Sequence, residues 1–145
     1  MSEKTQRIIV PIDGSEPSDR ALELGLSLAK ERGVALEVIS VIDLRHVDAF
    51  DGYMMTEQQF DELRIAVQEE VVSKAETRLE DAGVAFSTRL LWGGVVEQLL
   101  RASEETGVEM IVLGRTGRGF FGRLLEGSVS RGMAMHAKVP VVVVP

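Results

Sequence analysis

The 145-residue chain has no cysteine, which excludes disulfides, thiolate metal sites and cysteine nucleophiles. No stretch approaches the roughly 20 apolar residues that a membrane-spanning helix needs. The polar beginning, MSEKTQR, is not followed by the hydrophobic region of a secretory signal. The two histidines stand far apart and do not form a metal-binding pattern. We therefore expect a cytoplasmic protein that has no contact with membranes and no metal site of its own.

Basic residues are the minority, since 16 lysines and arginines stand against 23 acidic residues, for a net charge of −7 at pH 7. This acidity argues against general binding of nucleic acids. The region from residue 114 to residue 138 is the exception, because its only acidic residue is Glu126. Its basic residues are Arg115, Arg118, Arg123, Arg131 and Lys138. A positive island on an acidic protein favours a small anion over a long polyanion, which the remaining surface would repel.

The order of apolar and polar segments predicts an α/β fold. The apolar fraction of 45% and the charged fraction of 27% are typical of a globular protein, and the length fits a single domain over residues 1–145. Short apolar runs predict strands at residues 7–13, 35–42, 84–92, 108–114 and 139–144. Helical patterns between them cover residues 18–32, 56–83, 95–107 and 124–138.

Strands and helices thus alternate along the chain. The strands are apolar on both faces, as expected when helices cover both sides of a parallel sheet. Right-handed crossovers then make a doubly wound, five-stranded parallel sheet the leading architecture. In the segment 56–83, apolar side chains form one stripe of a long amphipathic helix. The stripe consists of Phe60, Leu63, Val67, Val71, Ala75 and Leu79.

The stretch GRTGRGFFGRLLEGS, residues 114–128, holds five of the chain's 14 glycines and follows the fourth predicted strand. Residues 117–122 satisfy the dinucleotide-binding pattern GxGxxG. However, that motif belongs after a first strand and needs an acidic residue about 20 positions later. This chain has only valines at that distance. Residues 122–128 approach the phosphate-loop pattern GxxxxGK[ST] but lack its lysine, which reaches the β- and γ-phosphates. Neither motif explains the stretch.

A third reading follows from the spacing Gly114-x2-Gly117-x9-Gly127-Ser128. Gly114 and Gly117 would let the backbone leave the strand and approach a ligand without interference from a Cβ atom. Gly127 and Ser128 stand near the start of the next helix, where free N–H groups and the helix dipole favour a phosphate. The hydroxyls of Ser128 and Ser130 can add hydrogen bonds. The alternative is a mobile connection between strand and helix that binds no ligand.

With this spacing the chain resembles the universal stress protein family, specifically its ATP-binding branch. The segment IIVPIDGSEPSDRALELGLSLAKERGVALEVISVID is similar to the family's opening, and EGSVSRGMAMHAKVPVVVVP is similar to its close. The resemblance implies the sheet order 3-2-1-4-5, in which the direction of winding reverses between the first and fourth strands. Asp13 and Gly114, at the ends of those strands, would then face one crevice of the kind in which open α/β sheets bind ligands.

Carried over by position, the resemblance implies the residues that contact an adenine nucleotide. Ile12 and Asp13 would lie at the adenine and ribose side, and the backbone of Val41 would meet the adenine. The residues assigned to the phosphates and ribose are Leu113, Gly114, Gly117, Gly127, Ser128, Val129 and Ser130. Other readings stay open, because Asp13 can instead form a turn before the next helix and Ser128 can be a helix cap. Ser15 is interpreted as a helix cap.

The resemblance implies a sensor or regulator that holds ATP, or AMP or ADP, with Mg²⁺ beside a triphosphate. The sequence offers no general base near the expected phosphates and no phosphate-loop lysine, so we expect no efficient catalysis. Slow ATP hydrolysis, or phosphorylation of Ser128 or Ser130, is the most that family analogy allows. Two alternatives are a nucleotide-free dimeric interaction module and an adenylyl-transfer enzyme of related fold. The second usually carries a serine-glycine-rich motif after its first strand, which PIDGSEPS does not reproduce.

The predicted last strand, at residues 139–144, is short and strongly apolar. An exposed edge of that kind is an association hazard unless it is covered. The family commonly uses this strand for assembly, so we expect a two-fold homodimer in which residues 139–144 meet their symmetry mate.

Overall fold

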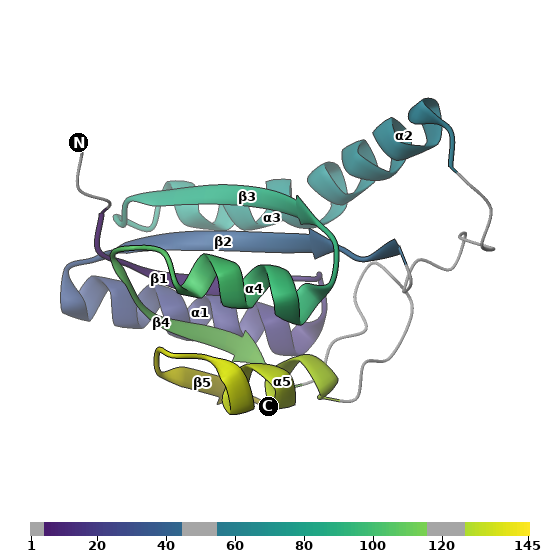
Figure 1. Cartoon of the computed structure of the whole chain (residues 1–145). Coiled ribbons are helices and arrows are strands. Elements are labelled where there is room, and N and C mark those ends of the chain that lie inside the picture. Colours follow the sequence, from purple (N-terminus) through teal and green to yellow (C-terminus); the bar gives the residue numbers. More distant parts are fainter. Residues whose placement is uncertain (1–4, 45–54, 116–126) are drawn as a thin grey trace.

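The computed structural model describes residues 5–44, 55–115 and 127–145. Its strands form one sheet in the order β3-β2-β1-β4-β5, and every neighbouring pair is parallel (Figure 1). The strands are β1 (Arg7–Pro11), β2 (Ala35–Ile42), β3 (Phe86–Trp92), β4 (Val108–Gly114) and β5 (Val141–Val144). The expected doubly wound sheet and its order are therefore confirmed.

Helices cover both faces of the sheet. The elements are α1 (Glu16–Arg32), α2 (Glu57–Val67), the π-helical segment η2 (Gln68–Val72), α3 (Ser73–Glu80), α4 (Val95–Ser103) and α5 (Ser128–His136). One core lies between the sheet and α1, α2 and α3, and the other lies between the sheet and α4 and α5. Ile8 and Val10 of β1 enter the first core and Ile9 enters the second, and all three are fully buried. Burial on both faces explains why the strand sequences do not alternate with polar residues.

Several predicted elements extend beyond those of the structure. The strand predicted at 7–13 ends at Pro11, and the strand predicted at 139–144 begins only after Pro140. The helix predicted at 124–138 runs from Ser128 to His136, and residues 124–126 lie outside the described part. The strand predicted at 84–92 begins at Phe86, and the helix predicted at 95–107 ends at Ser103. The middle of each predicted strand is correct, whereas the helix predicted at 56–83 is interrupted by the π-helical turn η2. Burial determines the interior of a strand, while caps and prolines determine the ends of an element.

The first turn of α1 confirms one predicted cap. Ser15 has extended backbone angles, and its side-chain oxygen accepts a hydrogen bond from the N–H of Ser18. Gly33 ends the helix in the left-handed conformation, with φ of 66°. Gly25 lets α1 approach β1, because a Cβ atom there would lie 2.5 Å from Cγ2 of Val10. Ser15 and Gly33 thus determine where α1 begins and ends, and Gly25 allows it to pack closely on the central strand.

One charged residue of β2 is buried, contrary to the expectation of entirely apolar strands. Glu37 is 7% exposed, and its Oε1 lies 3.4 Å from Nε of Arg7 and 3.2 Å from a guanidinium nitrogen of Arg89. Both arginines also pair with Glu105, at 3.2 and 2.9 Å. A buried carboxylate is tolerated when cations and hydrogen bonds surround it. This ion cluster lies toward the amino ends of β1 and β2, away from the strand ends at which a ligand is expected.

None of the helices in the described ranges is long and apolar enough to cross a membrane.

Candidate functional site

The carboxyl ends of the parallel strands form one edge of the sheet, and the arrowheads of β2, β3 and β4 point to it (Figure 1). The chain winds from β1 to β2 and β3 on one side and from β4 to β5 on the other. The reversal therefore falls between β1 and β4. Crevices at such reversals are the usual ligand sites of open α/β sheets.

The backbone of Val41 faces this crevice. Along β2, Ile39 accepts a hydrogen bond of 2.9 Å from the N–H of Ile12, whereas Ile42 accepts one of 2.9 Å from Gly93, which follows β3. Backbone groups of a strand alternate between its two neighbours. Val41 therefore directs its N–H and C=O toward the side of β1, at a level beyond the end of that strand.

Asp13 forms the turn between β1 and α1. Its Oδ1 accepts a hydrogen bond of 2.9 Å from the N–H of Ser15, and its own N–H donates to Oγ of Ser18 at 3.4 Å. The side chain is half-buried. The turn-forming interpretation of Asp13 is thus correct, and it uses only one carboxylate oxygen, so it does not exclude a ligand contact through the other.

Gly114 is needed for a different contact from the one that the sequence suggested. A Cβ atom at this position would lie 2.8 Å from the carbonyl carbon of Pro17 and 2.9 Å from the nitrogen of Ser18. Both are backbone atoms in the first turn of α1, so nothing there can move aside easily. Gly114 therefore permits close packing between the end of β4 and the start of α1, and the described residues give no separate evidence that it makes room for a ligand.

The start of α5 is held against the end of β4. Oγ of Ser130 lies 2.9 Å from the carbonyl oxygen of Arg115 and 3.0 Å from that of Gly127, so its proton is shared between two backbone acceptors. Gly127 precedes the helix with φ of 79°, a conformation that favours glycine. The N–H of Arg115 donates to Val144 of β5 at 2.7 Å. Ser130 is buried, and Ser128 is exposed.

The first turn of α5 offers free backbone donors. The first backbone hydrogen bond of the helix runs from the N–H of Arg131 to the carbonyl of Gly127, at 2.8 Å. The N–H groups of Ser128, Val129 and Ser130 therefore have no acceptor within the helix. Within the described residues, no side chain caps this end and its first turn has no acidic residue. Three N–H groups without an acceptor among the described residues, together with the positive end of the helix dipole, form an arrangement that suits an anion.

The remaining predicted residues contribute differently. Ile12 and Leu113 are 7% and 2% exposed, and their side chains belong to the two cores. Leu113 can therefore face a ligand only through its backbone. Ile12 borders a groove at this edge, and its N–H is already bonded to Ile39. Gly117 lies outside the described residues, as do Arg118 and Arg123.

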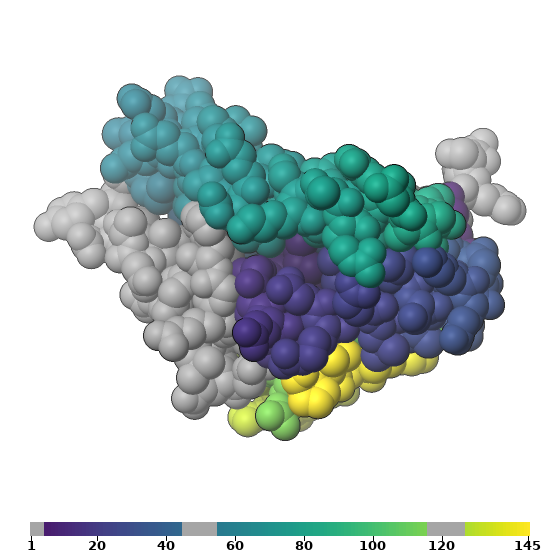
Figure 2. Space-filling view, turned by 180° about the vertical axis from the view of Figure 1, so that it is seen from behind, coloured from purple at the N-terminus to yellow at the C-terminus, as the bar shows by residue number. Residues whose placement is uncertain are grey.

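A groove of about 400 Å³ opens beside this edge, between α1 and the helix formed by η2 and α3 (Figure 2). Ile12 and Gly14 line one end of it, and charged side chains surround it. Arg78 of α3 binds both carboxylate oxygens of Glu23 of α1, each at 2.6 Å. Asp19, on the same groove, has a pKa raised above its usual range by burial and then by the neighbouring carboxylates of Asp13 and Glu16.

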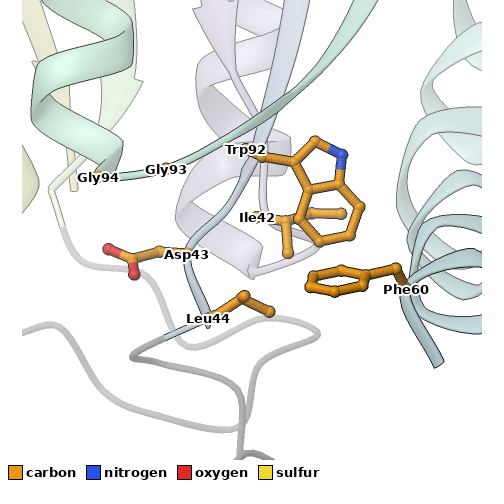
Figure 3. A pocket seen from close by; sticks show the side chains of 7 residues that line it. All are labelled: Ile42, Asp43, Leu44, Phe60, Trp92, Gly93 and Gly94. Carbon is orange, nitrogen blue, oxygen red and sulfur yellow. The ribbon is translucent and has the colours of Figure 1, made fainter. Parts of the chain in front are cut away.

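A second hollow, of about 440 Å³, lies where β2 and β3 end (Figure 3). Ile42, Leu44, Phe60 and Trp92 direct apolar side chains toward one another, whereas the carboxylate of Asp43 points away from them. The rings of Phe60 and Trp92 meet edge to face, with centroids 5.5 Å apart. Asp43, which is 5% exposed, was not among the predicted site residues, although an acidic residue directly after a buried strand is a signal that the sequence contains.

In the described parts of the chain, no group of three or more histidine, aspartate or glutamate residues is arranged to hold a metal ion.

Two solved structures of similar fold contain nucleotides. A universal stress protein in complex with cAMP is 21% identical, with a TM-score of 0.71 and coverage of 97% of both chains. The universal stress protein from Archaeoglobus fulgidus in complex with dAMP is 20% identical, with a TM-score of 0.69 and coverage of 97% of this chain and 98% of that one. At these identities the likeness concerns the fold.

Closer matches establish the family. The sequence model of the universal stress protein family matches residues 4–145. Universal stress protein MJ0531 of Methanocaldococcus jannaschii is 30% identical over 141 residues, which cover 96% of this chain and 81% of that protein. A crystal structure of a family member from Burkholderia pseudomallei is 29% identical, with a TM-score of 0.72 and coverage of 97% and 96%. The chain therefore belongs to the universal stress protein family.

Proposed function

We propose that this protein binds an adenine nucleotide at the crevice between the ends of β1 and β4 and acts in the cytoplasm as a stress-response regulator or sensor. The observation that carries the proposal is the start of α5. Its three N–H groups have no acceptor among the described residues, and Ser130 fastens this helix to the end of β4, the neighbour of the strand β1 that leads to Asp13. We also propose that residues 1–145 act as one domain, in agreement with the span of the family match.

In this proposal the phosphates bind to the N–H groups of Ser128, Val129 and Ser130, with Gly127 providing the left-handed turn before them. Leu113 and Gly114 add backbone contacts, and Gly117 would complete the phosphate side. Ser128 contributes its exposed hydroxyl. Since the hydroxyl of Ser130 is buried and engaged with two carbonyls, Ser128 is the better candidate for any phosphorylation.

The adenosine half would lie toward β2. The N–H and C=O of Val41 point into the gap beyond β1, where they can pair with the edge of a base. Asp13 can accept hydrogen bonds from ribose hydroxyls through the carboxylate oxygen that the turn leaves unused, and Ile12 borders the same place. The cAMP and dAMP complexes of two proteins with this fold support an adenine nucleotide as the ligand class.

The proposed role is regulation, because the chain has no phosphate-loop lysine and no base assigned to the phosphates. ATP is the nucleotide that we propose first, with AMP and ADP as the related candidates. A Mg²⁺ ion would accompany the triphosphate and would be held mainly by phosphate oxygens and water.

The proposal is tested by native mass spectrometry of freshly purified protein, followed by extraction and identification of any retained nucleotide. We expect an adenylate. Retention of no nucleotide, together with no binding of added ATP, would favour the nucleotide-free interaction module. Release of pyrophosphate from ATP in the presence of small acids would instead favour the adenylyl-transfer enzyme.

Base specificity gives a second test. If the backbone of Val41 reads the adenine edge, ATP should bind more tightly than GTP in calorimetry. Equal affinities would contradict this assignment and indicate that only the phosphates are recognised.

A further inference from the structure

Ser18 contacts both sides of the proposed crevice. It lies in the first turn of α1 and is 4% exposed. Its Oγ accepts the N–H of Asp13 at 3.4 Å and donates to the carbonyl of Ser15 at 3.0 Å. Its own N–H donates to Oγ of Ser15 at 3.3 Å. The turn that presents Asp13 is therefore tied to Ser18 by hydrogen bonds.

The backbone of Ser18 also meets the opposite side of the crevice. A Cβ atom at Gly114 would lie 2.9 Å from the Ser18 nitrogen, so the two backbones are in direct contact. The next residue, Arg115, holds the start of α5 through its carbonyl and Oγ of Ser130, at 2.9 Å. A short series of contacts thus runs from Asp13 through Ser18 to Gly114, Arg115 and the free N–H groups of α5.

We propose that Ser18 is a positioning residue, which fixes the Asp13 turn relative to the strand end that carries the phosphate-binding turn of α5. The inference rests on the proposed function. A ligand that contacts both the Asp13 turn and the start of α5 binds more tightly when these two parts are already held at a fixed separation. Binding then has to order few protein groups, so less conformational entropy is lost. ATP contacts both sides in this arrangement, whereas adenosine contacts only the Asp13 side. Ser18 therefore determines how much more tightly ATP binds than adenosine.

The test compares Ser18→Ala with Ser103→Ala. Ser103 is a matched control, because it is 2% exposed and its Oγ donates to the carbonyl three residues earlier, that of Leu100, at 2.7 Å. It lies at the last turn of α4 and contacts none of the residues proposed to bind nucleotide. The two variants lose the same kind of hydrogen bond, and only Ser18→Ala also releases the N–H of Asp13.

Affinities for ATP and for adenosine are measured by calorimetry on unmodified protein and both variants, with thermal unfolding recorded for each. We expect both variants to unfold at somewhat lower temperature. Ser18→Ala should bind ATP about 3- to 10-fold more weakly, as expected for loss of one hydrogen bond, and should lose less affinity for adenosine. Ser103→Ala should bind both ligands as the unmodified protein does.

Gly114→Ala provides an independent approach from the side of β4, in case Ser18→Ala does not fold. Its methyl group must push the first turn of α1 away, so the preference for ATP over adenosine should again decrease. The inference is overturned if a folded Ser18→Ala or Gly114→Ala keeps the ATP-to-adenosine ratio of the unmodified protein. It is also overturned if unmodified protein binds neither ligand, and in that case the proposed function fails as well.

Discussion

At the scale of single residues, Asp19 lies where the ionised form of its carboxyl group is disfavoured. Burial, together with the carboxylates of Asp13 and Glu16, raises its pKa above the ordinary value of 3.8, and Lys74 and Arg20 oppose this rise only in part. A raised pKa means that the fold favours the protonated carboxyl. The contribution of Asp19 to stability is therefore fully present below pH 3.8 and is lost as the pH rises through its pKa in the folded protein.

Asp19→Asn should accordingly stabilise the protein at neutral pH, because it removes a carboxylate that burial and two acidic neighbours disfavour. Urea unfolding at pH 7 should show a higher midpoint for the variant, and the difference should shrink as the pH falls toward 3.8, where Asp19 itself becomes neutral. The effect is small, since the side chain is mostly exposed. A variant that is less stable than the unmodified protein at pH 7 would contradict this interpretation.

Single residues also mark the limit of what the sequence can predict. The spacing of glycines identified Gly114, and the cap pattern identified Ser15, because both signals are local. The close contact between Gly114 and the first turn of α1 could not be predicted, since it depends on two segments that only the folded sheet brings together. The hydrogen bond from Ser130 to the carbonyl of Arg115 could not be predicted either, because the two residues are 15 positions apart and only the fold brings them together.

At the scale of elements, the segment 56–83 departs from the single regular helix that its apolar stripe predicted. Val72 marks the end of a π-helical turn in which the N–H of Ser73 bonds to the carbonyl of Gln68, five residues earlier. From Leu63 to Leu79 the stripe repeats every four residues. A regular α-helix turns by about 100° per residue, so each four-residue step moves the stripe about 40° around the helix and four steps move it about 160°. The π-helical turn accommodates one extra residue and thereby reduces this displacement by about 100°.

This geometry predicts that deletion of Glu69, an exposed residue of the π turn, is tolerated. The stripe would then repeat at the average spacing of a regular α-helix, and α2 and α3 should join without interruption. Circular dichroism should show undiminished helix content, and the unfolding midpoint should not fall. Deletion of Asp61 is the control, because it turns Phe60 away from Trp92 and should cost about 0.5–1.5 kcal/mol from the lost ring contact. A larger loss for the Glu69 deletion than for the Asp61 deletion would refute the explanation.

At the scale of the whole molecule, β5 forms an edge of the sheet, hydrogen-bonded to β4 on one side. Val142 and Val144 pack against the core beneath α1, and Val141 packs on the opposite core. Val143 is 37% exposed. We propose that this strand pairs with its symmetry mate in a homodimer, because an open apolar edge otherwise invites uncontrolled association.

Val143→Lys should give a folded monomer in sedimentation equilibrium, because a charge at an exposed edge position opposes pairing without disturbing either core. Val142 is less suitable for this test, since a lysine there would also damage the core. Ile65→Lys is the matched control: Ile65 is 47% exposed on α2, and its replacement should leave assembly unchanged. An unmodified protein that sediments as a monomer at high micromolar concentration would refute the dimer.

In the proposed site, the glycine turn before α5 lets a phosphate reach the backbone. Calorimetric titration of ATP into Gly127→Val and Gly83→Val tests this proposal most directly. Both glycines have left-handed backbones, with φ of 79° and 75°, so both variants carry a similar strain of about 1–2 kcal/mol. A Cβ atom meets nothing within 4 Å at Gly83 but would lie 3.3 Å from the Arg115 carbonyl oxygen at Gly127. With circular dichroism confirming both folds, we expect Gly127→Val to bind ATP about 10- to 150-fold more weakly and Gly83→Val to bind it as the unmodified protein does. Equal ATP affinity in the unmodified protein and a folded Gly127→Val would contradict the account.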